Sequence, residues 1–489
     1  MDNNSNKTAT DLPTFYWHDY ETFGLSPSLD RPSQFAGIRT DMDFNVIGEP
    51  DMFYCRQSDD YLPSPEAAMI TGITPQKTQA EGVSEAEFSK RIEAQFSQKN
   101  TCIIGYNNIR FDDEVTRNIF YRNFYDPYAH TWKDGNSRWD IIDLMRACYA
   151  LRPEGIVWPE NDDGLPSMRL ELLTAANGIE HANAHDATSD VYATIAMAKL
   201  VKEKQPKLFD FLFNLRSKRK VESLVDIINM TPLVHVSGMF GADRGFTSWV
   251  VPLAWHPTNN NAVIVADLAQ DITPLLELSA DELRERLYTP KKDLGDLTPI
   301  PLKLIHINKC PVLAPAKTLL PENAERLGID RSACLANLKR LKESATLREN
   351  VVGVYQVERE YPKSTNVDAM IYDGFFSAGD KANFEILRET APEQLTGLQL
   401  KVSDSRFNEL FFRYRARNFP HLLSMPEQQK WLDHCRTVLE DSAPAYFARL
   451  DALAIENSHD ERKMKLLQQL YLYGQKIIGA SAGHHHHHH

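Results

Sequence analysis

The sequence predicts an α/β domain, followed by a small, mainly β domain and an all-α domain. Between residues 14 and 205, short runs of strand-forming residues alternate with helical patterns. Strand-like runs spaced by Gly, Pro and Asn continue over residues 206–359, and apolar residues at helical spacing dominate residues 362–483. Residues 484–489 are histidines, which we interpret as an expression tag. At roughly 150 residues per domain, the length also predicts about three domains.

The first domain is expected to begin with a three-stranded antiparallel meander. Its strands are predicted at residues 16–24, 34–40 and 44–56, with turn signals between them. A capping box at Ser84 to Glu87 opens a helix that runs to Phe96. The remaining elements of this domain are a buried strand at 101–105 and helices at 111–121, 167–177 and 187–204.

The second and third domains are predicted from shorter patterns. Residues 206–220 are rich in Lys and Arg, and we interpret them as a junction. The second domain has a capped helix that begins at Ser279 and strand-like runs at 233–239, 247–255, 262–267 and 302–307, as expected of a small β-barrel. The third domain is predicted to hold helices at 407–416, 428–439, 446–455 and 461–478.

Composition narrows the class of protein. No apolar run approaches the ~18 residues of a membrane span, and the first dozen residues lack the apolar segment of a signal peptide, so we expect no membrane association. The six cysteines are scattered without a Cys-x-x-Cys pair, which favours reduced thiols and a cytoplasmic location. The net charge of −13 argues against a generally basic surface but allows a local positive groove.

The predicted strand at 16–24 carries two acids, Asp19 and Glu21, where a core strand should be apolar. Side chains at i and i+2 of a strand point to the same face, so the two carboxylates are expected to lie together. Such a pair raises the pKa of both groups, and oxygen ligands of this kind select Mg²⁺ or Mn²⁺. An Asp-x-Glu triplet also occurs by chance, so this pair alone is a weak indication of a metal site.

Two further stretches place acids at the ends of predicted elements. Asp112 follows the buried strand and opens a helix, a place where ligands of α/β sheets commonly bind; alternatively it only complements the helix dipole. His185 and Asp190 lie at the head of the helix 187–204. Five residues along a helix separate side chains by roughly 140°, so the two converge only if His185 lies in the loop before the helix. The alternative is a surface histidine near a helix start.

Taken in order, these stretches resemble a known family. Asp-x-Glu on the first strand, Asn-x-x-Phe-Asp entering a helix at Asp112, and His-x-x-x-x-Asp are similar to the three motifs of the DEDDh exonucleases of the ribonuclease H-like superfamily. Residues 71–74 are similar to another recurrent segment of that family. Residues 19–24, 107–114, 159–164 and 234–241 resemble the bacterial exonuclease I family, and the similarity covers nearly all of residues 14–480.

The resemblance implies a fold, an activity and a cofactor. It implies a ribonuclease H-like exonuclease domain over 14–205, an SH3-like β-barrel domain over 206–359 and a helical C-terminal domain over 362–483. Two Mg²⁺ ions, or Mn²⁺ in their place, would be held by Asp19, Glu21, Asp112 and Asp190. Neutral His185 would take the proton of the attacking water, as an imidazole with a pKa near ~6.5 can. The implied activity is processive 3′-to-5′ degradation of single-stranded DNA to 5′-mononucleotides, in DNA repair and recombination.

The sequence also predicts contacts to substrate and to a partner protein. Single-strand binding needs aromatic faces and cations, and we expect it from Glu21 together with Arg117, Tyr128, Trp132, Arg146, Arg169, Tyr372 and Phe375. Core packing is the alternative for about half of the aromatic residues near Arg117. The resemblance also implies a monomer that binds the acidic C-terminal tail of single-stranded-DNA-binding protein, with Lys218 to Lys220, or Lys339, Arg340 and Lys342, as candidate contacts.

Two alternative functions remain open at this point. The four acids do not distinguish DNA from RNA, so the chain could be a DEDDh exoribonuclease; a contact to the 2′-OH would decide. The second alternative is a non-catalytic single-strand-binding adaptor that keeps the fold. The presence of all four acids and of His185 argues against this adaptor.

Overall fold

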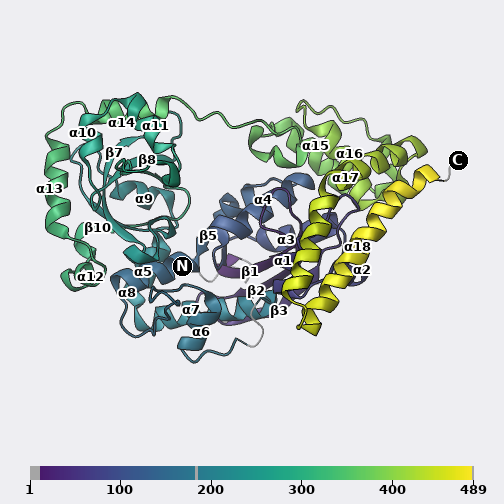
Figure 1. Ribbon diagram of the computed structural model, residues 1–489, viewed down its shortest axis with the longest axis horizontal. Coiled ribbons are helices and arrows are strands. Elements are labelled where there is room, and N and C mark those ends of the chain that lie inside the picture. Colours follow the sequence, from purple (N-terminus) through teal and green to yellow (C-terminus); the bar gives the residue numbers. More distant parts are fainter. Residues whose placement is uncertain (1–10, 182–184, 487–489) are drawn as a thin grey trace, which may run out of the picture. The chain divides into compact units, whose positions relative to one another are not determined.

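We describe a computed structural model of the chain, which covers residues 11–181 and 185–486 (Figure 1). These residues divide into two compact units. The first unit contains residues 11–137, 185–192 and 363–486, and the second contains residues 138–181 and 193–362. The catalytic candidates Asp19, Glu21, Asp112, His185 and Asp190 all belong to the first unit. Among the described residues, no helix is long and apolar enough to cross a membrane.

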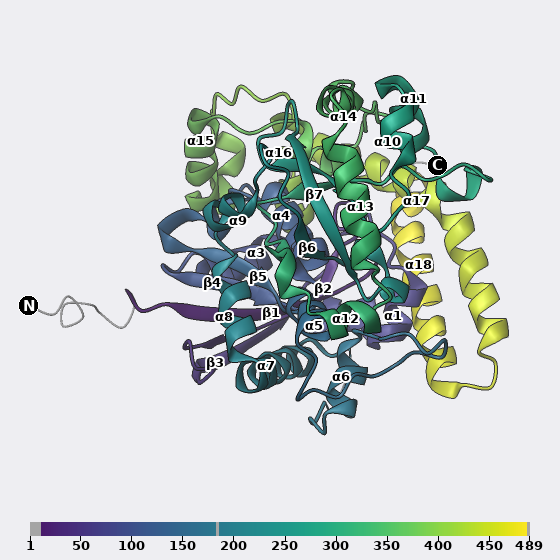
Figure 2. The same cartoon turned by 90° about the vertical axis from the view of Figure 1, so that its left-hand side faces the viewer.

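A mixed five-stranded sheet with the order β3-β2-β1-β4-β5 positions the first acids. Strand β1 is its central strand, antiparallel to β2 and parallel to β4, and β2 is antiparallel to β3, which confirms the predicted meander. Strands β1, β2 and β3 lie side by side in both views (Figures 1 and 2). Their bounds are β1 (Thr14–Thr22), β2 (Pro32–Thr40), β3 (Val46–Tyr54), β4 (Thr101–Gly105) and β5 (Ser137–Asp140).

Two helices cover one face of this sheet. Helix α3 (Glu85–Phe96) contributes Phe88 and Phe96, and α4 (Asp113–Arg122) contributes Phe120, to a cluster with Phe35 of β2 and Ile103 of β4. Burying each of these side chains stabilises the fold by roughly 1.5–3 kcal/mol, so the sheet that carries the acids is rigid. The other helices that follow β3 are α1 (Pro65–Thr71), α2 (Pro75–Glu81), α5 (Ile141–Leu151), α6 (Leu170–Ala176) and α7 (Ala187–Lys204).

The start of α3 corrects one detail of the prediction. The side-chain hydroxyl of Ser84 accepts a hydrogen bond from the backbone N–H of Glu87 at 3.3 Å, as an N-cap should. The carboxylate of Glu87 pairs instead with Arg91 at 3.1 Å, one helical turn on. At Ser279, by contrast, both halves of the capping box form, with Glu282 reaching back to the backbone of Ser279.

The C-terminal helices of the first unit correct a second prediction. The helices expected at 428–439 and 446–455 form one helix, α17 (Met425–Glu456), with Pro444 inside it. A proline within a helix removes one backbone hydrogen bond, but Leu439 before it and Leu450 after it are both buried, so packing keeps the helix continuous. Helix α17 packs along α18 (Glu461–His486), which extends beyond the predicted end at 478. The helices before them are α15 (Ala378–Glu389) and α16 (Phe407–Asn418).

The second unit contains an antiparallel sheet with the order β10-β6-β7-β8-β9. Its strands are β6 (Leu233–Val236), β7 (Thr247–Trp255), β8 (Ala262–Asp267), β9 (Leu302–His306) and β10 (Val312–Pro315). The segment interpreted as a basic junction forms two helices, α8 (Pro206–Asn214) and α9 (Lys218–Leu224); Phe209 and Phe213 of α8 pack on Trp139. The remaining helices are α10 (Thr273–Glu277), α11 (Ala280–Leu287), α12 (Pro321–Arg326), α13 (Arg331–Lys342) and α14 (Leu347–Gln356).

Candidate active site

Three acids converge at the end of β1. One carboxylate oxygen each from Asp19, Glu21 and Asp190 lies within 4.8 Å of the other two, although Asp190 is remote in sequence. Asp19 and Glu21 share a face of β1 because they are two residues apart. The pairing of β1 with β2 is irregular between Glu21 and Thr22, and such irregularities commonly redirect side chains next to functional sites.

The electrostatics of this cluster favour a bound cation. Burial, followed by the nearby carboxylates of Asp190 and Asp112, raises the pKa of Glu21 to about 9. Burial and the charges of Glu21 and Asp190 also raise the pKa of Asp19 well above its usual range. The Oδ2 atom of Asp19 is buried without a hydrogen-bond partner among the described residues. Three convergent carboxylates with an unsatisfied oxygen fit a divalent metal that prefers oxygen ligands.

Asp112 approaches the cluster from the next element along the chain. It is buried and lies at the start of α4, at the end of a short π-helix, Asn108–Asp112, that packs against β1 and β4. Asn107, which precedes this turn, has a left-handed backbone with φ 62°. The three acids described above do not include Asp112, but its charge raises the pKa of Glu21. The position after a buried strand was predicted, whereas the π-helix was not.

Strand β2 holds the segment that carries His185 and Asp190. His185 lies in a turn directly before α7, with a left-handed φ of 66°, and Asp190 is in the first turn of that helix. The buried Gln34 accepts a hydrogen bond from the backbone N–H of Ala187 at 3.3 Å and donates one to Asp186 at 3.5 Å. Gln34 is paired with Glu21 across the sheet. Gln34 therefore pairs with Glu21 through the sheet and contacts the start of α7 through its side chain.

A partly exposed group of aromatic and charged side chains lies on the first unit. The Arg117 guanidinium sits 5.0 Å from the ring centre of Tyr128, and the Tyr128 ring contacts that of Phe375 at 5.6 Å. Tyr372 donates a hydrogen bond to Glu114, which also pairs with Arg117 at 3.2 Å. Phe375 is 84% exposed and Trp132 is 67% exposed, so neither belongs to the core. Four of the predicted substrate residues, Arg117, Tyr128, Tyr372 and Phe375, are thus brought together.

Other aromatic residues of the same stretch serve the core, as the alternative interpretation expected. Phe120 is in the cluster beneath the sheet, and Tyr121 and Phe124 pack with Phe384 and Phe407 of the C-terminal helices. Arg146 and Arg169 belong to the second unit. The Arg146 guanidinium pairs with Asp143 at 3.2 Å, and Arg169 pairs with Glu171 while its side chain stays 67% exposed.

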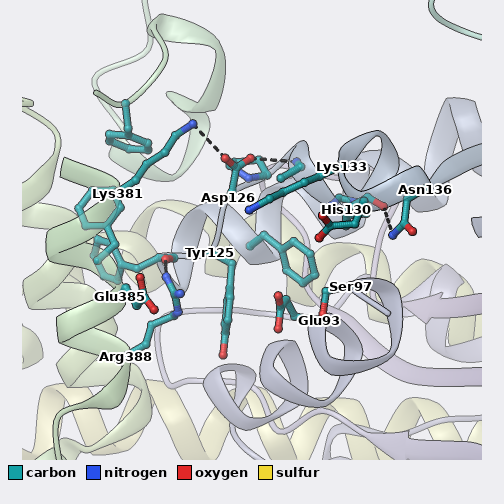
Figure 3. Close-up of a pocket in the computed structure, with 17 residues that line it drawn as sticks. Glu93, Ser97, Tyr125, Asp126, His130, Lys133, Asn136, Lys381, Glu385 and Arg388 are labelled. Atoms are coloured by element: carbon teal, nitrogen blue, oxygen red, sulfur yellow. Dashed lines mark hydrogen bonds and ion pairs between the residues drawn. The ribbon is translucent and has the colours of Figure 1, made fainter. Parts of the chain in front are cut away.

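Helix α15 contacts the loop that contains Tyr128 and Trp132 through an ion pair and a hydrogen bond. Asp126 accepts hydrogen bonds from the backbone N–H groups of Tyr128 and Ala129 at 2.8 and 3.0 Å, and Lys381 of α15 pairs with it at 2.9 Å. Arg388 of the same helix donates to the carbonyl of Phe124. Between loop and helix is a pocket of about 320 Å³, with Lys381 and Arg388 on one side and Asp126 and Tyr125 on the other (Figure 3).

Comparison with known proteins identifies the family. Models of three families match the chain: Exonuclease over residues 16–198, Exonuclease I SH3-like domain over 216–357 and Exonuclease I C-terminal domain over 365–477. Exodeoxyribonuclease I of Escherichia coli strain K12 is 61% identical over 95% of this chain and 98% of its own length. The chain belongs to the exonuclease I family. This confirms the expected enzyme class, an exonuclease, and the expected combination of an exonuclease domain, an SH3-like domain and a helical C-terminal domain.

Two solved structures of the family add information on ligands. The zinc-bound form of E. coli exonuclease I with single-stranded DNA superimposes with a TM-score of 0.93 at 60% identity, covering 95% of this chain and all of that chain. A structure of SSB and exonuclease I with the inhibitor CFAM has a TM-score of 0.90 at 59% identity, covering 95% of this chain and 99% of that chain. The family membership favours a DNA exonuclease over the exoribonuclease and adaptor alternatives.

Sequence reasoning missed three residues that the geometry draws attention to. Gln34, Asp126 and Lys381 touch the segments that carry predicted site residues, through hydrogen bonds or an ion pair. Gln34 is far in sequence from the segment of His185 and Asp190, and Lys381 is far in sequence from the loop of Tyr128. Neither residue belongs to a motif. Asp126 lies two residues before Tyr128, a spacing typical of Asx turns, and that spacing was an available signal.

Proposed function

We propose that this exonuclease I family member removes 5′-mononucleotides processively from the 3′ end of single-stranded DNA, with Asp19, Glu21, Asp112 and Asp190 holding Mg²⁺ or Mn²⁺ and His185 acting as general base. The observation that carries the proposal is the convergence of three carboxylates, one oxygen of each lying within 4.8 Å of the others, together with a buried Oδ2 of Asp19 that has no hydrogen-bond partner among the described residues. The three described acids of this cluster offer oxygen ligands, and these favour Mg²⁺ or Mn²⁺.

The residues of the site divide the chemistry between them. When bound, divalent metal would lower the pKa of a water molecule and stabilise charge on the departing 3′-oxygen. The four acids supply the negative charge that holds the metal at the end of β1. His185, in the turn before α7, would accept the proton of the attacking water in its neutral form. The support for this role is its position, beside the first turn that carries Asp190.

Substrate binding is proposed for the aromatic group of the first unit and for cations of each unit. Arg117, Tyr128, Trp132, Tyr372 and Phe375 offer stacking faces and positive charge, and each base stacked on an aromatic ring contributes about 1–3 kcal/mol. Glu21 is proposed to contact the 3′-terminal nucleotide as well as metal. In the second unit, the exposed Arg169 and the partly exposed Arg146 are proposed to contact phosphates.

Domain bounds, partner, oligomeric state and location complete the proposal. We propose three domains, at residues 14–205, 206–359 and 362–483. The similar bounds of the three family matches support this division. We propose that single-stranded-DNA-binding protein binds through its acidic C-terminal tail; the SSB structure supports binding of that protein. We propose a monomer, and a cytoplasmic location because all six cysteines are buried free thiols.

The decisive experiment follows degradation from each end. Single-stranded DNA labelled at its 3′ or 5′ end is incubated with the protein and Mg²⁺, beside RNA and duplex DNA. We expect immediate loss of the 3′ label as a mononucleotide, a shortening ladder from the 5′ label, and little action on RNA or duplex. Early release of the 5′ label as a mononucleotide would contradict the proposed polarity.

Two variants test the proposed roles. Asp19→Asn should remain folded and lose activity in Mg²⁺, because it removes a ligand charge from the cluster. His185→Ala should reduce turnover by about 10²-fold or more, the usual effect of losing a general base, while DNA binding stays nearly unchanged. Weaker DNA binding with normal turnover at saturation would instead assign His185 to substrate contact.

A further inference from the structure

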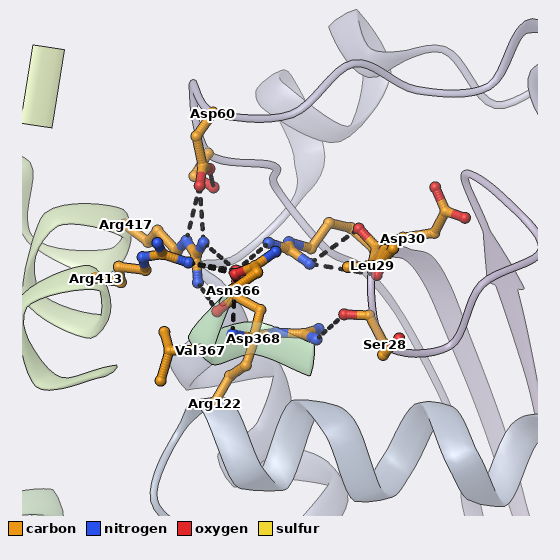
Figure 4. A network of polar contacts seen from close by, with 12 residues as sticks. Ser28, Leu29, Asp30, Asp60, Arg122, Asn366, Val367, Asp368, Arg413 and Arg417 are labelled. Atoms are coloured by element: carbon orange, nitrogen blue, oxygen red, sulfur yellow. Dashed lines mark hydrogen bonds and ion pairs between the residues drawn. The ribbon is translucent and has the colours of Figure 1, made fainter. Parts of the chain in front are cut away.

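Buried charged side chains join the loop after β1 to the C-terminal helices (Figure 4). We call Arg31, Arg122 and Arg417, with the three carboxylates Asp60, Glu85 and Asp368, the arginine cluster. Arg31 is 6% exposed and Arg122 is 3% exposed, so these charges are held inside the protein. Charges at this depth persist only when they are paired and hydrogen-bonded.

The ion pairs of the cluster are short and specific. Arg417 contacts Asp60 at 2.8 Å and Asp368 at 2.6 Å, and Arg122 contacts Glu85 at 2.8 Å. Arg31 reaches Asp368 at 3.3 Å. Burial by itself would raise the pKa of Asp368, but the adjacent Arg417, Arg31 and Arg413 guanidiniums keep that pKa far below its usual range. The Asp368 carboxylate is therefore held in its ionised form by the guanidiniums around it.

A cavity beside these ion pairs is lined by more positive than negative side chains. It is lined by four guanidiniums, those of Arg31, Arg56, Arg122 and Arg417, whereas Glu85 is the only carboxylate of the arginine cluster on its wall. Asp60 and Asp368 pair with the guanidiniums from outside the lining. The pKa of Arg31 is lowered by burial and then by the like charges of Arg122 and Arg417, as expected where positive groups crowd together.

The guanidiniums also retain hydrogen-bond donors. Each guanidinium has five N–H donors in a fixed plane. Within the described part of the chain, Nε of Arg31 has no hydrogen-bond partner, and Arg122 uses its guanidinium for Glu85 and for the carbonyl of Ser28 alone. The cavity has a volume of about 20 Å³. That is enough for one water-sized occupant and too little for a tetrahedral oxyanion such as phosphate.

We propose that this cavity binds one small inorganic anion of the size of chloride. Such an anion would offset the positive charge of the cavity wall and accept the donors left over by the ion pairs, which a neutral water does less well. By tying Arg31 of the loop and Arg122 of α4 to Arg417 of α16, it stabilises the attachment of the C-terminal helices to the sheet domain. The site is separate from the nuclease chemistry, and neither DNA nor divalent metal takes part in it.

Anomalous diffraction of the full chain tests occupancy directly. Crystals grown or soaked in sodium bromide in place of chloride should give a bromine peak in the cavity between Arg31, Arg122 and Arg417. Density there without any bromine signal at saturating bromide means water, and overturns the proposal. A peak that appears only at molar bromide marks an adventitious ion only, and also overturns it.

Thermal unfolding tests whether the anion matters in dilute solution. At constant ionic strength, chloride replaces gluconate, which is too large for the cavity, and the melting temperature is recorded. We expect a rise of about 1 °C per tenfold increase in chloride above its Kd, since a ligand that binds only the folded state stabilises by mass action. Arg56→Gln, at the cavity mouth, should need several-fold more chloride for the same rise.

The matched control is Arg91→Gln. Arg91 is an exposed arginine of α3 that does not line the cavity, and it pairs with Glu87 at 3.1 Å, so the substitution removes the same charge elsewhere. Arg91→Gln should keep the wild-type chloride response. Identical responses of the wild type, Arg56→Gln and Arg91→Gln would show a general salt effect and overturn the proposal.

Discussion

At the scale of single residues, Glu21 makes the metal-free protein sensitive to pH. Burial and the carboxylates of Asp190 and Asp112 raise its pKa in the folded protein to about 9, from an ordinary value of 4.5. The folded state therefore holds the proton more tightly than the unfolded state between these two values. In that window the stability of the metal-free protein falls as pH rises, by at most about 1.4 kcal/mol per pH unit for one group.

Glu21→Gln should remove much of this pH dependence. With EDTA present, the variant should melt at nearly the wild-type temperature at pH 5 and above it at pH 8 to 9, because an uncharged amide replaces a carboxyl that is costly to ionise. Melting curves from pH 5 to 9 measure the difference, with the exposed Glu81→Gln as control. Adding Mg²⁺ should stabilise the wild type most at high pH. Parallel curves for Glu21→Gln and wild type would contradict this explanation.

Much of the candidate site followed from the sequence because residue spacing along a strand is fixed. Asp19 and Glu21 must share a face of β1, and the position of His185 before α7 followed from its distance to Asp190. The support from Gln34 could not be predicted in the same way. Its importance arises from the register between β1 and β2, which sets Gln34 beside Glu21, and from contacts to a helix that lies 153 residues further along the chain.

At the scale of elements, the contact between β2 and α7 should control metal affinity. Gln34→Leu keeps the side-chain volume but leaves the N–H of Ala187 and the carboxylate of Asp186 without their partner on β2. We expect a loss of about 10–100-fold in activity at low Mg²⁺, the usual effect of removing a group that orients metal ligands, with partial recovery at high Mg²⁺.

Titration of activity with Mg²⁺ measures this effect, and DNA affinity in EDTA should stay near that of the wild type. Gln57→Leu is the matched control, because Gln57 is another buried glutamine, whose side chain contacts Cys55, Thr78 and the carbonyl of Pro32 rather than Ala187 or Asp186. An equal loss of activity in both variants would indicate general destabilisation and would contradict a positioning role for Gln34.

The contact between α15 and the loop of Tyr128 should control substrate affinity. In Lys381→Met, Asp126 loses its ion pair but keeps its hydrogen bonds to the backbone, so the loop should loosen without unfolding. We expect KM for long single strands to rise severalfold while kcat changes less than twofold. Lys465→Met, an exposed lysine of α18, is the control. A lower kcat at unchanged KM would place the effect at the catalytic acids instead.

At the scale of the whole molecule, the described contacts join residues across the domain bounds read from the sequence. The short strand β5 and the helices α1 and α2 were missed because they have only 4, 7 and 7 residues, too few for a clear periodicity. The division into two compact units was also beyond sequence patterns, because the first unit joins residues 11–137 to 363–486. Side chains remote in sequence, such as Phe124 and Phe384, make that connection.

These contacts predict that the exonuclease segment does not fold by itself. A fragment that ends at Gln205 would lose the C-terminal helices, and so would expose Tyr121 and Phe124, which are 1% exposed in the full chain. Burying aromatic side chains of this size contributes roughly 1.5–3 kcal/mol each, and Arg31 and Asp60 would in addition lose the buried partners that Asp368 and Arg417 provide. Those losses together approach the roughly 5–15 kcal/mol that separates a folded domain from its unfolded state.

We therefore expect the fragment 11–205 to aggregate or to unfold without a cooperative transition, even though it contains Asp19, Glu21, Asp112, His185 and Asp190. Circular dichroism and calorimetry of the purified fragment measure this directly. The informative comparison is the same fragment mixed with a separately produced chain of residues 363–483, which supplies the missing helices. Recovery of a cooperative transition in the mixture is the expected result. A fragment that melts cooperatively alone, near the temperature of the full chain, would mean that the helical domain contributes little to the stability of the catalytic sheet.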